Sequence, residues 1–215
     1  TSQLLSVPYA LYATKTDTAK YSTKTDTAKY STKTDTAKYA LNAGSSSGGF
    51  THYIGEKFGG GVVYNLWKDS SGAEHGLVVA LTDQSTTAAW SNITSTAIGS
   101  SAQSSWDGLS NSNAIVAQSG HTSSAAKLCL DLVSGGYSDW YLPSVQELNM
   151  LWNNYYMVSR SLAQISGAMQ LQADYYWSSS EFNGKPNAWY FTFTIGLTSH
   201  YSKNGAYYVR AVRAF

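Results

Sequence analysis

A nine-residue unit is repeated almost three times near the amino terminus, between Thr14 and Ala40. The copies read TKTDTAKYS, TKTDTAKYS and TKTDTAKYA. An α-helix turns about 100° per residue, so successive copies would face opposite sides of a single helix. A β-strand has a period of two, so an odd repeat changes faces there as well. The period therefore favours either a mixed unit of helical turn and extended chain or a segment with no fixed inner face.

The spacing of alanine and tyrosine in the repeat helps to decide between a structured unit and a segment with no fixed inner face. A solvated, disordered Thr/Lys/Asp linker is one interpretation of the repeat. Alanine and tyrosine nevertheless recur in register, at Ala19 and Tyr21, Ala28 and Tyr30, and Ala37 and Tyr39. A spacer has no need of that register, and repeats that cannot bury a core alone bury it against neighbours or other chains. We therefore expect residues 1–43 to form a multi-chain stalk and the Gly/Ser-rich residues 44–51 to form a linker.

The repeat also resembles a known kind of fibre. Nonads in trimeric adhesin stalks alternate short helical segments with a β-layer shared by three chains, and this repeat is similar to them. The preceding segment, SVPYALYA, resembles a motif found just before the stalks of bacterial surface fibres and phage tail fibres. The resemblance implies a homotrimer.

Composition limits the partners that the remainder of the chain would have. The chain has 215 residues, 43% of them hydrophobic, which is enough for one globular core beside a stalk. The net charge of +1 favours neither nucleic acid nor an anionic membrane surface as a partner. No apolar run is long enough for membrane insertion, since the longest covers only residues 77–81. Only 13% of residues are charged, and Tyr, Ser, Thr, Asn and Gly abound, as in extracellular β-rich proteins and antibody-like binding surfaces.

Hydrophobic patterning predicts one mixed domain over residues 52–215. Strands are expected at residues 61–64, 76–81, 188–194 and 207–215, and a long Ser/Thr/Asn-rich loop at 83–112. One helix is expected with Ala125, Leu128, Cys129 and Leu132 on its buried face. A second should begin after Pro143, where Ser144 and Glu147 fit a capping box, and its apolar stripe should comprise Leu148, Leu151, Trp152 and Tyr155.

Alternation along residues 188–194 separates two kinds of aromatic residue. Trp189, Phe191 and Phe193 fall on one face, which we expect to pack in the core with Trp177. Tyr190, Thr192 and Thr194 fall on the other face. Polar neighbours indicate that Tyr190, His200, Tyr201 and Tyr207 are exposed.

Several segments of this region together resemble one family. They are GGYSDWYLPS at 135–144 with Glu147-Leu148, YWSSSE at 176–181, AWY at 188–190, and YVRAVR at 208–213. In this order they are similar to the C-terminal domain of the collagen-like bacterial adhesin Lcl and its relatives, which have C-type-lectin-like and formylglycine-generating-enzyme-like folds. The resemblance implies an α+β head in which two helices pack on a small twisted antiparallel sheet. Some relatives are target proteins of diversity-generating retroelements, in which the stretch that corresponds to residues 181–207 carries the ligand-facing side chains.

Residues of the kind that catalysis requires do not form a recognisable pattern. The single cysteine, Cys129, cannot supply the cysteine pair used by the enzyme branch of this fold, and its apolar neighbours indicate a core residue. The histidines lack metal-ligand spacing, and no G-x-S-x-G segment marks a nucleophile. The glutamate and aspartate signatures of calcium-dependent lectins are missing too, so neither an enzyme nor a cofactor or metal site is expected. Arg210 and Arg213 should pair with buried carboxylates or carbonyls, and Asp139 should form a turn.

The leading hypothesis is a receptor-binding or adhesion protein at the tip of a trimeric fibre. It would be extracellular, on a bacterial surface or a phage virion tail fibre, and would recognise a cell-surface protein or glycan. Tyr gives large contact area at low entropy cost, and Ser and Asn give adaptable hydrogen bonds. The alternative is a structural trimerisation cap that has no ligand of its own. The candidate ligand-binding residues are Phe182, Asn183, Asn187, Tyr190, Thr192, Ser199, His200, Tyr201, Lys203, Asn204 and Tyr207.

Overall fold

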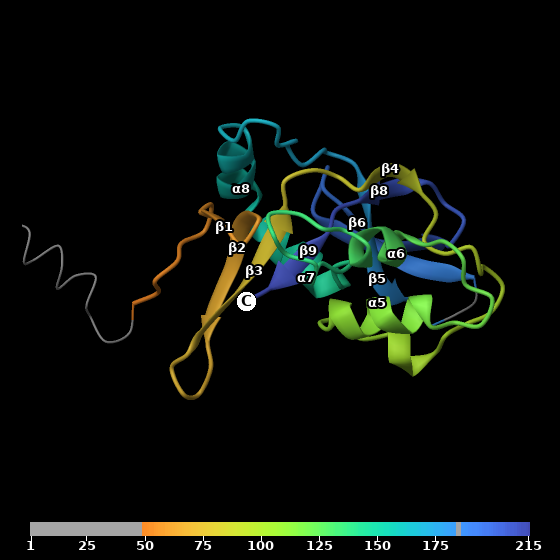
Figure 1. Cartoon of the computed structure of the whole chain (residues 1–215). Helices are drawn as coiled ribbons and strands as arrows, with labels where there is room; N and C mark the ends of the chain where they lie inside the picture. The colour runs from red at the N-terminus through yellow and green to blue at the C-terminus, as the bar shows by residue number, and fades with distance from the viewer. Residues whose placement is uncertain (1–48, 184–185) are drawn as a thin grey trace, which may run out of the picture. The chain divides into compact units, whose positions relative to one another are not determined.

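The computed structural model of the chain describes residues 49–183 and 186–215 (Figure 1). The chain divides into two units, Thr1–Thr51 and His52–Phe215, and the second contains all the elements described below. The predicted stalk, residues 1–43, lies outside the described residues, as do residues 44–48 of the predicted linker. The domain at 52–215 is α+β, as expected, but its helices and sheets are arranged differently from the prediction.

Two sheets, not one, form the framework of the domain. The first is antiparallel and has the order β1-β2-β3-β9: Lys57–Phe58, Gly61–Lys68, Glu74–Ala80 and Val212–Ala214. The second has the order β4-β8-β5-β6-β7: Ser85–Ala88, Tyr207–Val209, Tyr175–Glu181, Asn187–Thr192 and Leu197–Ser202. Its β5–β8 pair is parallel and its other pairs are antiparallel.

The carboxyl-terminal segment joins the two sheets. We predicted one strand over residues 207–215, but the chain pairs as β8 in the second sheet and then as β9 in the first. The crossing occurs at Arg210, whose buried guanidinium forms an ion pair with Asp83 at 2.8 Å. The same guanidinium donates to the carbonyls of Ala80 and Met169 at 3.0 and 2.8 Å. The predicted pairing of Arg210 is thus confirmed, and it anchors the crossing.

Four α-helices are present among the described residues, where two were predicted. They are α5 (Gly108–Val116), α6 (Ala125–Leu130), α7 (Val145–Asn153) and α8 (Tyr155–Leu162); a short 3₁₀ helix, η2, covers Ser100–Ala102. Helix α5 lies partly inside the loop predicted at residues 83–112. It was not predicted because Ser and Asn, which disfavour helices, are frequent in its sequence. It is stabilised locally, since the Asp107 side chain accepts a hydrogen bond from Ser110 N at 2.9 Å. Its buried Asn111 donates to Ser104 O at 2.7 Å.

The helix predicted after Pro143 is interrupted. Its capping box is present, with Ser144 and Glu147 bonded reciprocally to each other's backbone N–H. Asn154, however, has non-helical angles (φ −110°, ψ 15°), and its side-chain amide donates to Tyr64 O at 3.0 Å. Leu148 and Leu151 are buried on α7 as predicted, whereas Tyr155 belongs to the next helix.

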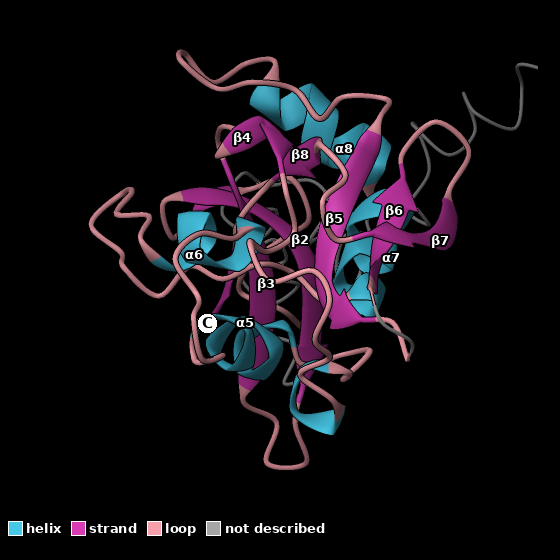
Figure 2. Cartoon of the chain, turned by 90° about the vertical axis from the view of Figure 1, so that its right-hand side faces the viewer, coloured by secondary structure: helices cyan, strands magenta, loops and turns pink. Residues whose placement is uncertain are grey.

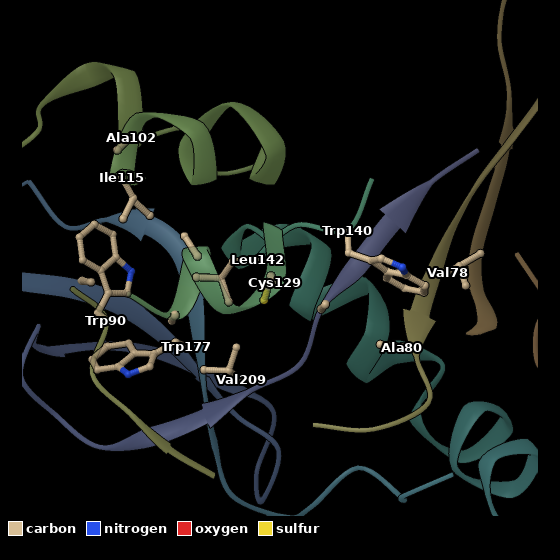
Figure 3. Packing of buried hydrophobic residues seen from close by; sticks show 14 of the residues in the cluster. Val78, Ala80, Trp90, Ala102, Ile115, Cys129, Trp140, Leu142, Trp177 and Val209 are labelled. Atoms are coloured by element: carbon tan, nitrogen blue, oxygen red, sulfur yellow. The ribbon is translucent and has the colours of Figure 1, made fainter. Parts of the chain in front are cut away.

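Both faces of the central strands are covered, which explains their continuous apolar sequences. In β3, Val78 and Ala80 belong to one hydrophobic cluster together with residues of α5 and α6. Leu77 and Val79 belong to a second cluster together with residues of α7 and α8. Figure 3 shows the first cluster, in which Cys129 lies near Leu142 and Val209. Leu128 does not join this cluster as predicted, because it is 40% exposed on α6.

Candidate binding surface on the β6–β7 hairpin

The predicted binding residues lie mainly on the hairpin of β6 and β7, at one edge of the second sheet (Figure 2). The two strands pair without a register shift from Asn187 opposite Ser202 to Thr192 opposite Leu197. The turn between them contains Gly196, which has a positive φ of 72° and lies against the indole of Trp152 on α7. A β-carbon at residue 196 would lie 2.3 Å from Trp152 Nε1, so only glycine allows this approach. The hairpin is thereby fixed to the helical layer.

Four tyrosines form a cluster on one face of the sheet, and we call Tyr175, Tyr190, Tyr201 and Tyr207 the tyrosine cluster. Tyr207 lies at its centre, with ring centroids 5.3, 5.0 and 5.7 Å from those of Tyr175, Tyr190 and Tyr201. Tyr175 and Tyr201 are 43% and 53% exposed. Tyr190 and Tyr207 are half-buried and pack on the core, Tyr207 against Trp177 at 4.6 Å. The predicted exposure therefore holds fully for Tyr201 and only in part for Tyr190 and Tyr207.

The electrostatics of the tyrosine cluster favour neutral phenols. Burial raises the pKa of Tyr207 from 10.0 to about 12, and the neighbouring tyrosines together with Asp174 act in the same direction. At neutral pH the Tyr207 hydroxyl can therefore both donate and accept a hydrogen bond. The cluster offers large aromatic area with polar tips, which is the composition typical of antibody binding surfaces.

A hollow of about 390 Å³ adjoins the tyrosine cluster. It is lined by Tyr175, Tyr190, Thr192, Thr194, Ile195, Leu197, Thr198 and Ser199. Ile195 and Leu197 in this lining are 63% and 57% exposed. The hollow thus combines apolar area with hydroxyl groups, and none of its lining residues carries a charge.

The opposite face of the hairpin carries a second aromatic group. The exposed ring of His200 is stacked on the half-buried Phe182, with centroids 3.8 Å apart, and meets Trp189 edge-on at 5.6 Å. The Asn187 side-chain nitrogen lies 3.3 Å from His200 Nδ1. We call Phe182, Asn187, Trp189 and His200 the histidine group. The prediction that Trp189 packs in the core is wrong. Trp189 is half-buried, whereas Trp177, Phe191 and Phe193 are buried as predicted.

Two predicted binding residues are buried. Lys203 is fully enclosed: its ammonium donates to Glu181 Oε1 at 2.6 Å and to Thr96 O at 3.2 Å, and lies 4.8 Å from the Trp90 ring centroid. Thr192 is only 6% exposed, although it forms part of the lining of the hollow. Since a buried side chain cannot reach a ligand directly, Lys203 is corrected to a structural role. The other predicted residues, Asn183, Ser199 and Asn204, are exposed.

The motif at residues 176–181 builds the scaffold behind this surface. Ser178 Oγ donates to Trp189 O and Ser180 Oγ to Ser104 O, both at 2.8 Å. The Glu181 carboxylate accepts from Ile98 N and Gly99 N at 2.8 Å, so it fixes the loop that precedes η2. Extra residues in this stretch of β5 break the register with β6, and the three serines there are buried.

Two carboxylates outside this surface also have structural partners. Glu147 is 6% exposed, and burial raises its pKa, while bonds from Ser144 N and the Tyr141 hydroxyl oppose that shift. Asp139 accepts both bonds from the Arg213 guanidinium, at 2.7 and 2.8 Å, and the pKa of Asp139 is lowered by this pairing. Asp139 therefore pairs with Arg213 and does not form the predicted turn.

The described part of the chain contains no group of three or more His, Cys, Asp or Glu side chains placed to hold a metal ion. Across residues 49–183 and 186–215, no helix has the length and apolar character needed to cross a membrane.

Sequence reasoning missed Tyr175. The predicted binding region began at Glu181, the last residue of the YWSSSE segment, so it excluded the rest of β5. The signal was nevertheless present: Tyr175 and Trp177 share one face of β5, and Trp177 lies opposite Tyr190 in the ladder. Alternation applied to β5 as well as β6 would have placed Tyr175 next to Tyr190.

Comparison with known proteins identifies one family. A model described as the Lcl C-terminal domain matches residues 79–213, which is more than half of the chain. The curated proteins contain no match to this chain.

Proposed function

This chain belongs to the Lcl C-terminal domain family, and from that premise we propose that residues 52–215 are the receptor-binding head of an adhesin. The family is consistent with an adhesin-like or fibre-associated domain. The proposal extends this to recognition of a cell-surface receptor at the tip of a fibre, with the head in a C-type-lectin-like fold. The surface that would bind is the tyrosine cluster and its adjoining hollow.

One observation carries this proposal: two large aromatic side chains of one cluster are left substantially exposed. Tyr175 and Tyr201 are 43% and 53% exposed although they border a core that buries Trp177 completely. Rings held by their neighbours lose little entropy when a ligand covers them, and exposed aromatic patches of this kind mark interaction sites. A purely structural cap would gain nothing from leaving these rings in water.

The proposal includes assembly. Three heads on one trimeric stalk would bind a cell surface with an avidity that exceeds the affinity of a single head by about 10²–10⁴. The repeat at residues 14–40 is the feature that supports a homotrimer. We propose an extracellular fibre of a bacterial surface or a phage tail as the setting.

Exchange of the two exposed rings tests the binding role. In the whole chain, Tyr175→Ser with Tyr201→Ser should lower binding to a panel of bacterial and mammalian cells at least tenfold, measured by flow cytometry of labelled protein. Tyr156→Ser is the matched control, because Tyr156 is 70% exposed on α8 and lies outside the cluster. Its binding should equal that of the unaltered protein. If the double variant binds every cell type as well as the control does, the tyrosine cluster is not the receptor site.

A further inference from the structure

The β7 strand is an unprotected sheet edge, unlike the other edges of the two sheets. The other edge strands are short or irregular: β1 has two residues, β9 has three, and β4 has four with a break in register. β7 has six residues, LTSHYS, and pairs with β6 without interruption. It contains no Pro, Lys, Arg, Asp or Glu, the residues with which proteins commonly protect such edges.

The ladder determines which backbone groups of β7 point away from the sheet. Lys203 N donates to Pro186 O at 2.8 Å, so these two residues form a hydrogen-bonded pair just before Asn187 and Ser202. Bonded and non-bonded pairs alternate in an antiparallel ladder. Thr198 and His200 therefore direct their N–H and C=O groups outward. Within the described residues, these four groups take part in no turn, loop or cap hydrogen bond of the backbone.

Side-chain sites lie on both faces of this edge. The tyrosine cluster and the hollow lie on the face of Leu197, Ser199 and Tyr201, and the histidine group lies on the face of His200. A strand added along β7 would alternate its own side chains between these two faces. Outward backbone groups flanked by side-chain sites are the arrangement by which sheets bind extended peptides.

We propose that the β7 edge binds an extended segment of a receptor protein by strand addition, with the tyrosine cluster receiving alternate side chains. The inference rests on the proposed function and deepens it, because it names a polypeptide and not a glycan as the ligand. Backbone donors and acceptors at strand spacing are matched along their length only by another extended chain.

The aromatic rings near the edge indicate the character of that segment. The faces of tyrosine rings attract cations, and none of the residues that line the hollow carries a charge of its own. A Lys or Arg on the incoming strand could therefore pack against the rings of the tyrosine cluster. A second β7 strand carries neither residue, so the chemistry favours a different protein over another copy of this chain.

The test removes one outward donor and leaves the β6–β7 ladder intact. Thr198→Pro deletes the Thr198 N–H, and proline is tolerated on an edge strand where the N–H faces solvent. Thr198→Val is the matched control, since it keeps the backbone and the branched shape. The probe is a phage-displayed library of random linear 12-residue peptides selected on the whole chain.

We expect selected peptides to bind the unaltered protein and Thr198→Val equally, to bind Thr198→Pro at least tenfold more weakly, and to be enriched in Lys or Arg. Hydrogen exchange on the unaltered chain gives a readout that does not depend on a variant. A bound peptide should slow exchange of the Thr198 and His200 amides, while that of Ser199, already bonded to β6, changes little.

Three results would overturn the inference. Equal peptide binding to Thr198→Pro and Thr198→Val would exclude strand addition, as would a library that yields no binder while a glycan array does. Concentration-dependent self-association that Thr198→Pro abolishes would make a second copy the occupant. Failure of the proposed function is distinguishable from these, because the Tyr175/Tyr201 double variant would then bind cells normally.

Discussion

The ammonium of Lys203 shows how burial decides the role of a single residue. In sequence it lies among exposed Tyr, Ser and Asn residues, and on that ground a ligand contact is a reasonable expectation. In the structure it is enclosed with Glu181, and together they join β5, the end of β7 and the loop that precedes η2. The residues next to Lys203 in sequence indicate which face of the strand is polar. They do not indicate that Glu181, 22 residues away, places its carboxylate inside the fold.

Lys203→Met is predicted to destabilise the domain by about 3–5 kcal/mol, because it leaves the Glu181 carboxylate buried without a counter-ion. The measurement is urea unfolding of the whole chain followed by tryptophan fluorescence. The double variant Lys203→Met with Glu181→Gln should recover part of the loss, since an amide oxygen in the place of Glu181 Oε2 can still accept from both Ile98 N and Gly99 N. If the single variant unfolds like the unaltered protein and only cell binding falls, Lys203 is a ligand contact after all.

At the scale of secondary structure, the sequence predicted elements whose signals are local. The capping box of α7 and the alternation of β6 each depend on residues a few positions apart. The capping box is present in the structure, and Phe191 and Phe193 are buried as the alternation predicted. Helix α5 was missed because tertiary bonds, from Asn111 to Ser179 and from Ser112 to Leu142 O, offset its weak helix propensity. The change of sheet at Arg210 was missed because its cause, Asp83, is remote in the chain. The candidate site followed the same rule: the hairpin was found from its own residues, while Tyr175 on a neighbouring strand was not.

Gly196→Ala is predicted to loosen the hairpin from α7. Positive φ alone costs an alanine about 1–2 kcal/mol, and the clash with Trp152 should add about 1–3 kcal/mol. Gly72→Ala is the matched control: its φ is 85°, yet an added β-carbon has no neighbour within 4 Å, so only the first cost applies. Urea unfolding of both variants measures the difference. Equal losses in the two variants would mean that the contact with Trp152 does not hold the turn.

At the scale of the whole molecule, the segments that identify the family lie mainly in the core, and only Tyr190 of the AWY segment also belongs to the surface proposed to bind. Trp140, Leu142 and Trp177 from those segments are fully buried, and Glu147 and Glu181 hold backbone groups in place. The tyrosine cluster lies on one face of the second sheet, where the exposed Tyr175 and Tyr201 can change without leaving a cavity in the core. A scaffold of this kind would accept many receptor specificities, which is the property that target proteins of diversity-generating retroelements require.

The last prediction concerns assembly, on which the avidity of such a head depends. The whole chain should sediment as a trimer at micromolar concentration, because the nonads between Thr14 and Ala40 keep Ala and Tyr in a register that one chain alone has no evident use for. Deletion of residues 14–40 should lower the mass toward that of a monomer and weaken cell binding by about 10² or more through lost effective concentration. Peptide binding at the β7 edge of each head should stay unchanged, since that strand lies wholly within residues 52–215. A whole chain that sediments as a monomer would contradict the stalk proposal. A deletion variant that remains trimeric would mean that the assembly interface lies in the head and not in the repeat.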